Sequence, residues 1–372
     1  MFKRSVLTAL AVLLFASLAC GAPVTDLPGV VTAPPPTSAA TLPGGPLTLD
    51  VGFGYAGPFY EVYFTDPFNR AAQMQEGGPD TPLVAAIDAA RLSVDMAVYS
   101  LSLTSVRDAL VRAHQRGVQV RLVMESDNMQ RDVPNSLIAD GINILGDRRE
   151  GLMHNKFVVI DRAEVWTGSM NLTTSGTYDD NNNLIRIRST KIAENYTTEF
   201  EEMYLRDLFG PDALAATPNP VVTVDGISVE TLFSPDDKPA RRIAELLRAA
   251  SSSIYFMAYS FTANDLGDIL VDKARNGVTV AGVMEEEQIK SNQGSEFDPF
   301  TQARMDVYAD GNLGLMHHKV FIIDQQIVIL GSYNFSLSAE KRNDENLLII
   351  FDPNLAAQYL AEFQRVYAEA KR

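Results

Sequence analysis

The chain has 372 residues, which is enough for two domains of ordinary size. A hydrophobic content of 46% and a charged content of 21% exclude a disordered chain and a protein built mainly of membrane spans. The formal net charge of −16 argues against a general nucleic-acid binder, because an acidic protein has no long-range attraction for a phosphate backbone.

The first 20 residues have the features of an export signal. Lys3 and Arg4 precede an apolar run, residues 6–18, that is too short for a transmembrane helix. The run leads to Cys20, the one cysteine of the chain, and residues 17–20 resemble a bacterial lipobox with serine at its first position. We therefore expect residues 1–20 to act as a signal segment, with lipidation of Cys20 anchoring the protein in the cell envelope.

Ordinary secretory cleavage near Ala19 or Ala22 is the alternative, and in both cases the protein leaves the cytoplasm. Acylation of Cys20 would leave no thiol for a disulfide or a metal site. Residues 21–48 are rich in Pro, Ala, Thr and Gly, a composition typical of a flexible linker. We expect this linker to hold the folded part a short way from a membrane surface.

The rest of the chain consists of two copies of one pattern. Two segments recur 160 residues later, residues 97–100 at 257–260 and residues 123–125 at 283–285. Two further segments recur 163 residues later, residues 153–156 at 316–319 and residues 168–171 at 331–334. A repeat this long indicates two domain-sized halves, which we place at residues 49–217 and 218–372.

Each half has an α/β pattern. We predict helices at 83–90 and 243–250, strands at 93–99 and 253–259, helices at 105–116 and 264–276, and strands at 119–124 and 279–284. Gly117 and Gly277 end the second helices. This alternation favours a mixed sheet flanked by helices in each half.

Two of the four histidines begin a His-x-Lys-x4-Asp motif, with His154 and Lys156 in the first half and His317 and Lys319 in the second. The apolar runs that follow predict that each motif lies on a buried strand. Because side chains two residues apart on a strand point to one face, about 6.5–7 Å apart, each motif presents an imidazole and a cation to one point.

The remaining residues near the motifs have simpler interpretations. Asp161 and Asp324 lie at odd spacing from the histidines, so we expect them to form the turn of the following hairpin through bonds to backbone. His318 faces the other side of the strand from its neighbour, and we do not expect it to act in catalysis. His114 lies on an amphipathic helix between two arginines and is interpreted as a surface residue.

Each motif is followed by Gly-Ser-x-Asn at the end of a returning strand. Ser169 and Asn171 in the first half, like Ser332 and Asn334 in the second, share a face by the same spacing. The glycine allows a close approach of the backbone to a ligand. Two lysines and two asparagines supply fixed donors for a phosphate, so this chemistry requires no metal and no cofactor.

The two His-x-Lys-x4-Asp motifs, each followed by Gly-Ser-x-Asn, resemble the phospholipase D superfamily from about residue 50 to residue 372. The resemblance implies two homologous halves packed with pseudo-two-fold symmetry around one active site, and a monomer because one chain holds both halves. It also implies a two-step reaction. One histidine forms a phosphohistidine, while the other protonates the leaving alcohol and then activates water.

By this resemblance His154 is the nucleophile and His317 the general acid, with the reverse assignment left open. The same resemblance assigns the phosphoryl oxygens to Lys156, Lys319, Asn171 and Asn334, with added hydrogen bonds from Ser169 and Ser332.

One position breaks the symmetry. Glu345 resembles the acidic residue that, in the family, orients the histidine of the opposite half, here His154. The first half has Asn182 in its place, with Asp179 or Asp180 as alternatives. A histidine that lacks a carboxylate partner should have a lower pKa, so we expect activity to favour mildly acidic pH.

The leading hypothesis is a phosphodiesterase that hydrolyses phospholipid of the phosphatidylcholine or cardiolipin class. An exported endonuclease is the alternative, and a phosphodiester-binding lipoprotein without turnover is the third. A basic groove would favour nucleic acid, and the arginines that could form one are Arg148, Arg149, Arg186, Arg188 and Arg342. A short pocket with an apolar rim would favour lipid.

Overall fold

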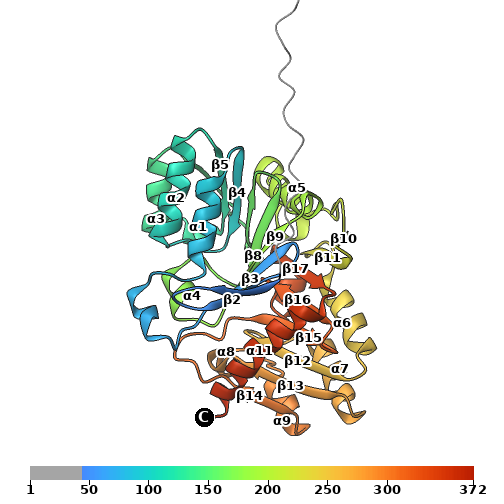
Figure 1. Cartoon of the computed structure of the whole chain (residues 1–372). Coiled ribbons are helices and arrows are strands. Elements are labelled where there is room, and N and C mark those ends of the chain that lie inside the picture. The colour runs from blue at the N-terminus through green and yellow to red at the C-terminus, as the bar shows by residue number, and fades with distance from the viewer. Residues whose placement is uncertain (1–43) are drawn as a thin grey trace, which may run out of the picture. The chain divides into compact units, whose positions relative to one another are not determined.

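Two separate β-sheets organise the part of the chain that the computed structural model describes, residues 44–372 (Figure 1). These residues belong to one compact unit. The predicted signal segment, Cys20 and nearly all of the predicted linker lie outside the described residues. Within residues 44–372, no helix combines the length and the apolar character needed to cross a bilayer.

The first sheet has nine strands in the order β1-β2-β3-β9-β8-β7-β4-β5-β6. β4, β5 and β6 run parallel, and the other neighbours are antiparallel, so the sheet is mixed as predicted. The strands are β1 (Gly45–Thr48), β2 (Phe53–Ala56), β3 (Tyr60–Phe64), β4 (Ser93–Val98), β5 (Gln119–Met124), β6 (Asn143–Gly146), β7 (Lys156–Ile160), β8 (Glu164–Gly168) and β9 (Asn183–Arg188).

The second sheet repeats this plan with eight strands in the order β10-β11-β17-β16-β15-β12-β13-β14. β12, β13 and β14 are the parallel strands, and they correspond to β4, β5 and β6. The strands are β10 (Val221–Val224), β11 (Ile227–Ser234), β12 (Ser253–Ala258), β13 (Thr279–Met284), β14 (Asp306–Ala309), β15 (Lys319–Ile323), β16 (Ile327–Gly331) and β17 (Glu345–Ile350).

Helices flank both sheets and follow the same order in each half. The first half has η1 (Arg70–Met74), α1 (Asp80–Ala89), α2 (Thr104–Gln115), η2 (Ser126–Asn128), α3 (Asp132–Ala139), α4 (Thr174–Tyr178), α5 (Thr190–Arg206) and η3 (Gly210–Asp212). The second half has α6 (Pro239–Ala249), α7 (Asn264–Arg275), α8 (Glu286–Ser291), α9 (Phe297–Gln302), α10 (Leu337–Lys341) and α11 (Pro353–Ala370). α2 and α7 end at glycines with φ of +87°, as predicted.

One apolar core joins the two halves. It contains residues of α5 and α11 together with residues from the inner faces of both sheets. Tyr196 of α5 packs edge-on against Phe233 of β11, with ring centroids 5.1 Å apart, and Tyr359 of α11 packs against Phe64 of β3 at 5.0 Å. Two further cores lie within single halves, beneath α1 and α2 in one and beneath α6 and α7 in the other. The halves are therefore fixed to each other through a shared core.

Candidate active site

Each His-x-Lys motif lies at the start of a central strand. β7 begins at Lys156 and β15 at Lys319, so both histidines precede the strands in which the sequence had placed them. In place of a strand partner, the backbone N–H of His154 donates to the carbonyl of Asp344 at 3.0 Å, across the two halves. The backbone N–H of His317 donates across in the same way, at 2.9 Å. Each histidine is thus held by the opposite half.

The side chains of the histidines also find partners in the opposite half. Nδ1 of His154 lies 2.7 Å from Oε2 of Glu345, and Nδ1 of His317 lies 3.0 Å from Oδ1 of Asn182. The predicted pairing across the halves is confirmed. Only 6% of His154 and 4% of His317 are exposed, so both contacts are shielded from water.

Asn182 is held in one orientation. Its Nδ2 donates to the carbonyl of Gly176 at 2.8 Å, which directs its oxygen to His317. Asp180 does not replace it, because Oδ1 of Asp180 accepts the backbone N–H of Leu315 at 2.9 Å. An amide oxygen can only accept, so the neutral His317 carries its proton on Nδ1 and leaves Nε2 unprotonated.

Charged groups of both halves influence the ionisation of each histidine. Burial lowers the pKa of His154 to about 4, the Glu345 carboxylate opposes this change, and Lys156 and Lys319 add to it. Burial also lowers the pKa of His317 well below its usual range, and Lys319, Lys156 and His154 lower it further. A lysine of each half therefore acts on the histidine of the other half.

The two lysines are as deeply buried as the histidines. Nζ of Lys156 donates to the carbonyl of His154 at 2.8 Å, and Nζ of Lys319 donates to that of His317 at 2.7 Å. Burial lowers the pKa of Lys156 to about 7, with Glu345 opposing, and burial together with Lys156 lowers the pKa of Lys319. Two partly desolvated cations in one site favour binding of an anion, which would restore their charge.

A tyrosine packs against each histidine, and the sequence analysis assigned neither of them a role. The rings of Tyr99 and His154 meet edge-on with centroids 5.1 Å apart, and those of Tyr259 and His317 with centroids 4.6 Å apart. The lysine of the same motif lies over each tyrosine ring, at 5.3 Å and 4.4 Å from the centroid. The recurrence of Tyr99 as Tyr259 at the 160-residue offset was the signal that could have revealed them.

The serines of the Gly-Ser-x-Asn segments form hydrogen bonds with residues of neighbouring loops and strands. Oγ of Ser169 donates to Asn182 at 2.8 Å and accepts the backbone N–H of Asn183, and Oγ of Ser332 accepts that of Asn346. Both serines are fully buried and these bonds hold the loops, while the substrate contacts that the resemblance implies for them stay a prediction. Gly168 approaches a neighbouring strand, not a ligand, because a Cβ there would lie 2.3 Å from a β9 carbonyl.

The asparagines of these segments retain unused hydrogen-bonding capacity. Oδ1 of Asn171 and Oδ1 of Asn334 are buried, and neither has a hydrogen-bond partner within residues 44–372. The two positions are equivalent in the repeat, and each asparagine follows the serine that binds β9 or β17. A buried amide without a partner is costly, so this pair is suited to contacts with a bound group.

Asp161 and Asp324 have structural roles. Both begin two-residue turns with positive φ, and their carboxylates accept backbone N–H groups ahead of the central strands β4 and β12. The turn role is confirmed, but the bonds reach a different loop from the expected hairpin. Burial alone would raise the pKa of Asp324, but the backbone N–H groups of Ser253, Ser252 and Ser251 hold it below its usual range.

His318 has a structural role that the sequence analysis missed. It is fully buried, with Nε2 2.9 Å from Oε1 of Glu362 and Nδ1 2.9 Å from Nδ2 of Asn183. Arg365 donates to the same oxygen of Glu362 at 2.8 Å. His318 thus links α11 to β9 of the opposite half, and no local feature of the sequence indicates this link. His114 is exposed, as predicted.

The contacts of His318 continue to the other histidine of its half. Nδ2 of Asn183 donates to Oγ of Ser169 at 3.2 Å, and that hydroxyl donates to Oδ1 of Asn182, which faces His317. A chain of hydrogen bonds therefore joins α11 to His317. The first half has Asn155 in the place of His318, and Asn155 bonds to Asn346 at 2.9 Å.

Four of the five arginines that could form a basic groove pair with acidic side chains. Arg148 and Arg149 both pair with Asp207, and Arg186 pairs with Glu164. Arg188 pairs in the same way with a buried glutamate of β3. Of the five candidates, only Arg342 makes no ion pair with any residue in the described range.

Comparison with known proteins agrees with this geometry. The profile of a family described as "Cardiolipin synthase, PLD-like domain" matches residues 83–204 and again residues 243–367, which together make up more than half of the chain. The chain belongs to this phospholipase D-like family. Each half carries one copy of the family's domain, which accounts for the two offsets in the sequence and for the two similar sheets.

Individual members of the family give the class of activity. The chain is 34% identical over 163 residues to a phospholipase D of Rickettsia bellii (strain RML369-C), covering 42% of this chain and 81% of that protein. It is 29% identical over 177 residues to a mitochondrial cardiolipin hydrolase of Chlamydomonas reinhardtii, covering 41% and 79%. The protein is a phosphodiesterase of the phospholipase D type.

A solved structure shows the same arrangement over both halves. The phosphatidylserine synthase of Haemophilus influenzae Rd KW20 superimposes with a TM-score of 0.59, at 13% identity, over 81% of this chain and 85% of that one. At this identity the likeness establishes the fold alone, with two phospholipase D-like halves in one chain.

Proposed function

We propose that the protein hydrolyses phospholipids in two displacements at one phosphorus. In the first, Nε2 of His154 attacks phosphorus, the bond to the leaving alcohol breaks, and His317 gives its proton to that alcohol. In the second, the now neutral His317 takes a proton from water, the water oxygen attacks phosphorus, and the bond to His154 breaks. The products are the free head-group alcohol and a phosphomonoester.

The contact between Glu345 and His154 carries this assignment. A histidine that becomes phosphorylated on Nε2 holds a positive ring, and a carboxylate 2.7 Å from Nδ1 stabilises that charge. His317 has the neutral Asn182 in that place, which makes its protonated ring a stronger acid. The first half therefore supplies the nucleophile, and the second half supplies the acid.

The lysines and asparagines would receive the phosphoryl oxygens. Lys156 and Lys319 are buried cations, and the side-chain amides of Asn171 and Asn334 can donate from Nδ2 to a phosphoryl oxygen. A phosphodiester between them would compensate the charge of the two lysines and accept hydrogen bonds from the two amides. In this proposal the two lysines supply the charge that a metal supplies elsewhere, so a chelator should not inhibit the reaction.

Two features of the surface support a lipid over a nucleic acid. Four of the five arginines considered for a basic groove are paired with acids, two of them with the same aspartate, which weakens the electrostatic track that a polyanion needs. Apolar side chains are exposed on the loops that lead to the two histidines. Leu313, four residues before His317, is fully exposed, and Leu152, two residues before His154, is 37% exposed.

We also propose that the protein is exported and anchored by a lipid on Cys20, which would keep the site close to a membrane. The basic start, the apolar run and the cysteine after it support this proposal. Labelling cells with a radioactive fatty acid tests it, since label should appear on the wild-type chain and be absent from Cys20→Ala. Label on both chains, or on neither, would contradict the anchor.

The substrate proposal is tested by assaying the purified chain against vesicles of phosphatidylcholine or cardiolipin and against single- and double-stranded DNA. We expect release of head group from lipid, no cleavage of DNA, and no loss of activity in a chelator. His154→Ala serves as the control for contaminating enzymes. Cleavage of DNA without lipid turnover would replace the proposal by the endonuclease alternative.

A further inference from the structure

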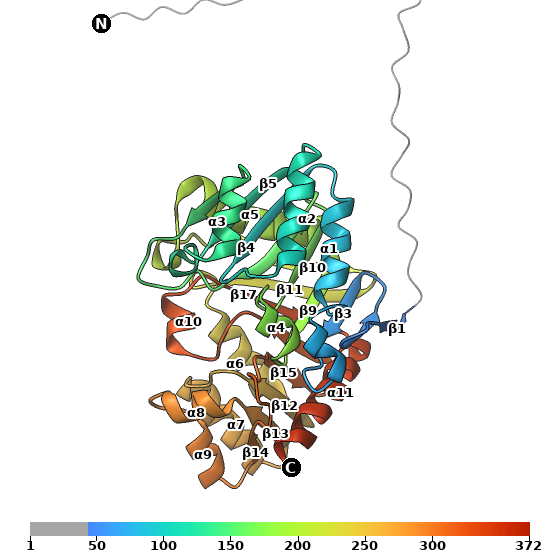
Figure 2. The same ribbon diagram turned by 90° about the vertical axis from the view of Figure 1, so that its left-hand side faces the viewer.

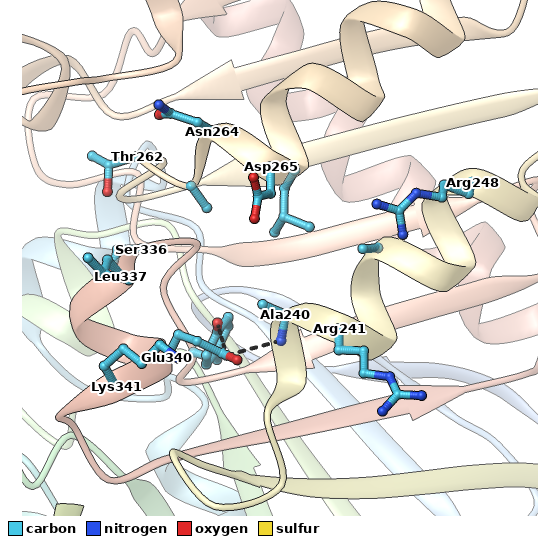
Figure 3. A pocket seen from close by; sticks show the side chains of 14 residues that line it. Ala240, Arg241, Arg248, Thr262, Asn264, Asp265, Ser336, Leu337, Glu340 and Lys341 are labelled. Carbon is cyan, nitrogen blue, oxygen red and sulfur yellow. Dashed lines mark hydrogen bonds between the residues drawn. The ribbon is translucent and has the colours of Figure 1, made fainter. Parts of the chain in front are cut away.

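A cavity of about 600 Å³ lies on the second half, apart from the histidines, between α6, the start of α7 and α10. Its floor is formed by small or apolar side chains, among them Ala240, Ala244 and Leu266, with the ring of Tyr333. Figure 3 shows Arg241 and Arg248 on the α6 side of this space and Leu337 and Lys341 on the α10 side. Its volume is within the range of sites for small ligands, about 300–1,000 Å³.

The first half fills the equivalent position with its own side chain. Tyr178 of α4 is 1% exposed, and its hydroxyl donates to Oδ1 of Asp80 at the start of α1, at 2.9 Å. Ser105 donates to the other oxygen of Asp80 at 2.7 Å. The loop ahead of α1 closes over the ring, since a Cβ on Gly78 would lie 2.9 Å from it.

The repeat shows how the second half opened this space. At the 160-residue offset, three positions that hold Asp80, Val84 and Leu103 in the first half hold alanine in the second. These alanines, at 240, 244 and 263, all line the cavity. The buried ring of Tyr178 is replaced at the 163-residue offset by Lys341. A niche closed by packing in one half is therefore an accessible cavity in the other.

The rim changes in charge at the same time. Three rim positions that are neutral or acidic in the first half are basic in the second, where they are Arg241, Arg248 and Lys341. Arg241 pairs with Glu245, whereas Arg248 and Lys341 make no ion pair with any described residue. In a chain with a net charge of −16, two unpaired cations beside an apolar floor mark a local site for an anion.

Two carboxylates also line the cavity. Glu340 already has hydrogen-bond partners within the protein, because its Oε2 accepts the hydroxyl of Tyr333 at 2.7 Å and the backbone N–H of Ala240 at 3.1 Å. Asp265 lies in the first turn of α7 and reduces the positive charge at one side of the rim. The anion is therefore best placed on the rim, where Arg248 and Lys341 remain unpaired on opposite sides of the space.

We propose that this cavity binds a single-chain anionic amphiphile, with its apolar chain on the alanine and tyrosine floor and its carboxylate or phosphate on the rim that carries Arg248 and Lys341. A free fatty acid and a lysophospholipid with a terminal phosphate share this chemistry. The apolar floor contributes by removing the chain from water, and the cations select the sign of the head group. The site does not depend on turnover at the histidines.

The test is binding of 11-(dansylamino)undecanoic acid to the purified full chain, followed by its fluorescence. Dodecanoate and dodecyl phosphate distinguish the two anions as competitors, and dodecyltrimethylammonium is the control of opposite charge. We expect either or both anions to displace the probe and the cation to fail. Displacement by the cation as readily as by the anions would overturn the assignment of the rim.

Variants locate the site. Ala244→Phe fills the cavity and should weaken probe binding at least about tenfold, because the chain has no space left. Arg248→Glu should weaken it about tenfold by reversing the rim charge, whereas Arg275→Glu, the same change on α7 outside the cavity, should leave it within about twofold. Unchanged unfolding temperatures verify the fold, and full probe binding by Ala244→Phe would refute the proposal.

Discussion

The two ends of the active site are built from the same parts and differ at the partner of each histidine. His154 faces a buried carboxylate from the second half, and His317 faces a buried amide from the first half. Hydrogen bonds with Gly176 and Ser169 hold the amide of Asn182 in one orientation, whereas the carboxylate of Glu345 acts on His154 through its charge. Two copies of one motif can thus be given different ionisation, and so different roles, by a single substitution at equivalent positions.

The support behind the two ends differs as well. Behind the His317 end, His318 joins Glu362 of α11 to Asn183 of β9. At the equivalent place behind His154, Asn155 makes a shorter connection to Asn346. Asn346 also accepts from Thr167 at 2.6 Å and from Tyr196 at 3.2 Å, so both ends have a buried network, and the one behind His317 includes the ion pair of Glu362 with Arg365. In Figure 2, α4 and α10, the equivalent short helices that follow the Gly-Ser-x-Asn segments, both lie on the face of the molecule that is turned toward the viewer.

The largest effect should come from removing either imidazole. His154→Ala and His317→Ala should each lower kcat for phospholipid by about 10³-fold or more, since each removes a group that reacts directly. Initial rates on vesicles at saturating substrate measure this effect. An unchanged circular dichroism spectrum is the control, and retention of more than a tenth of the rate by either variant would contradict the two-histidine account.

The partners should differ in importance. Glu345→Gln should lower kcat by about 10²-fold, because the nucleophile loses the charge that stabilises its phosphorylated ring. Asn182→Ala should lower kcat by a smaller factor, because His317 loses only a neutral hydrogen-bond acceptor. The ratio of the two effects tests the asymmetry directly, and equal losses would show that the two ends are equivalent.

Asn182→Glu should make the two ends alike. A carboxylate beside His317 raises the pKa of that imidazole, so the proton needed for the leaving group is retained to higher pH. The basic limb of the profile of kcat/KM against pH should therefore move up by about one unit, with the wild type favouring mildly acidic pH. Glu345→Asp, which keeps a carboxylate at the other end, is the control. If the basic limb of the Asn182→Glu profile does not move, Asn182 does not set the pKa of His317.

The smallest effect is expected at His318. His318→Asn copies the first half and should lower kcat a few-fold, about 2- to 10-fold, by loosening the chain that holds Asn182. Asn155→His, the reciprocal exchange, is the matched variant. If His318 only stabilises the fold, His318→Asn will lower the unfolding temperature without moving the pH profile, and a shift of the basic limb separates the two roles.

Much of the fold was predictable because the repeat presents the same periodicity twice. The strands β5 and β13 begin and end where the sequence predicted, and the resemblance to the phospholipase D superfamily implied the pairing of Glu345 with His154. The residues that were missed depend on contacts between the halves. Nothing local in the sequence indicates that His318 meets Asn183, since the two are brought together only by the packing of α11 against the opposite sheet.

The two serines show what residue spacing along a strand leaves undetermined. Spacing placed Ser169 and Ser332 on the face of a ligand, but alternation along a strand does not reveal which neighbour a side chain meets. Here the neighbours are the backbone N–H groups of Asn183 and Asn346, which donate to the two hydroxyl oxygens, and a contact of either serine with substrate stays a prediction. A polar side chain that shares a face with a catalytic group can be consumed by the loop that carries it.

The central claim is that two imidazoles from different halves act on one phosphorus, and trapping the intermediate tests it most directly. A p-nitrophenyl phosphodiester needs little help to lose its alcohol, so His317→Ala should still form the phosphoenzyme but release it slowly. Peptide mapping after a rapid quench should find the added mass on His154, and His154→Ala should carry none. An adduct on His317 of His154→Ala, or steady turnover with no adduct in any variant, would contradict the account.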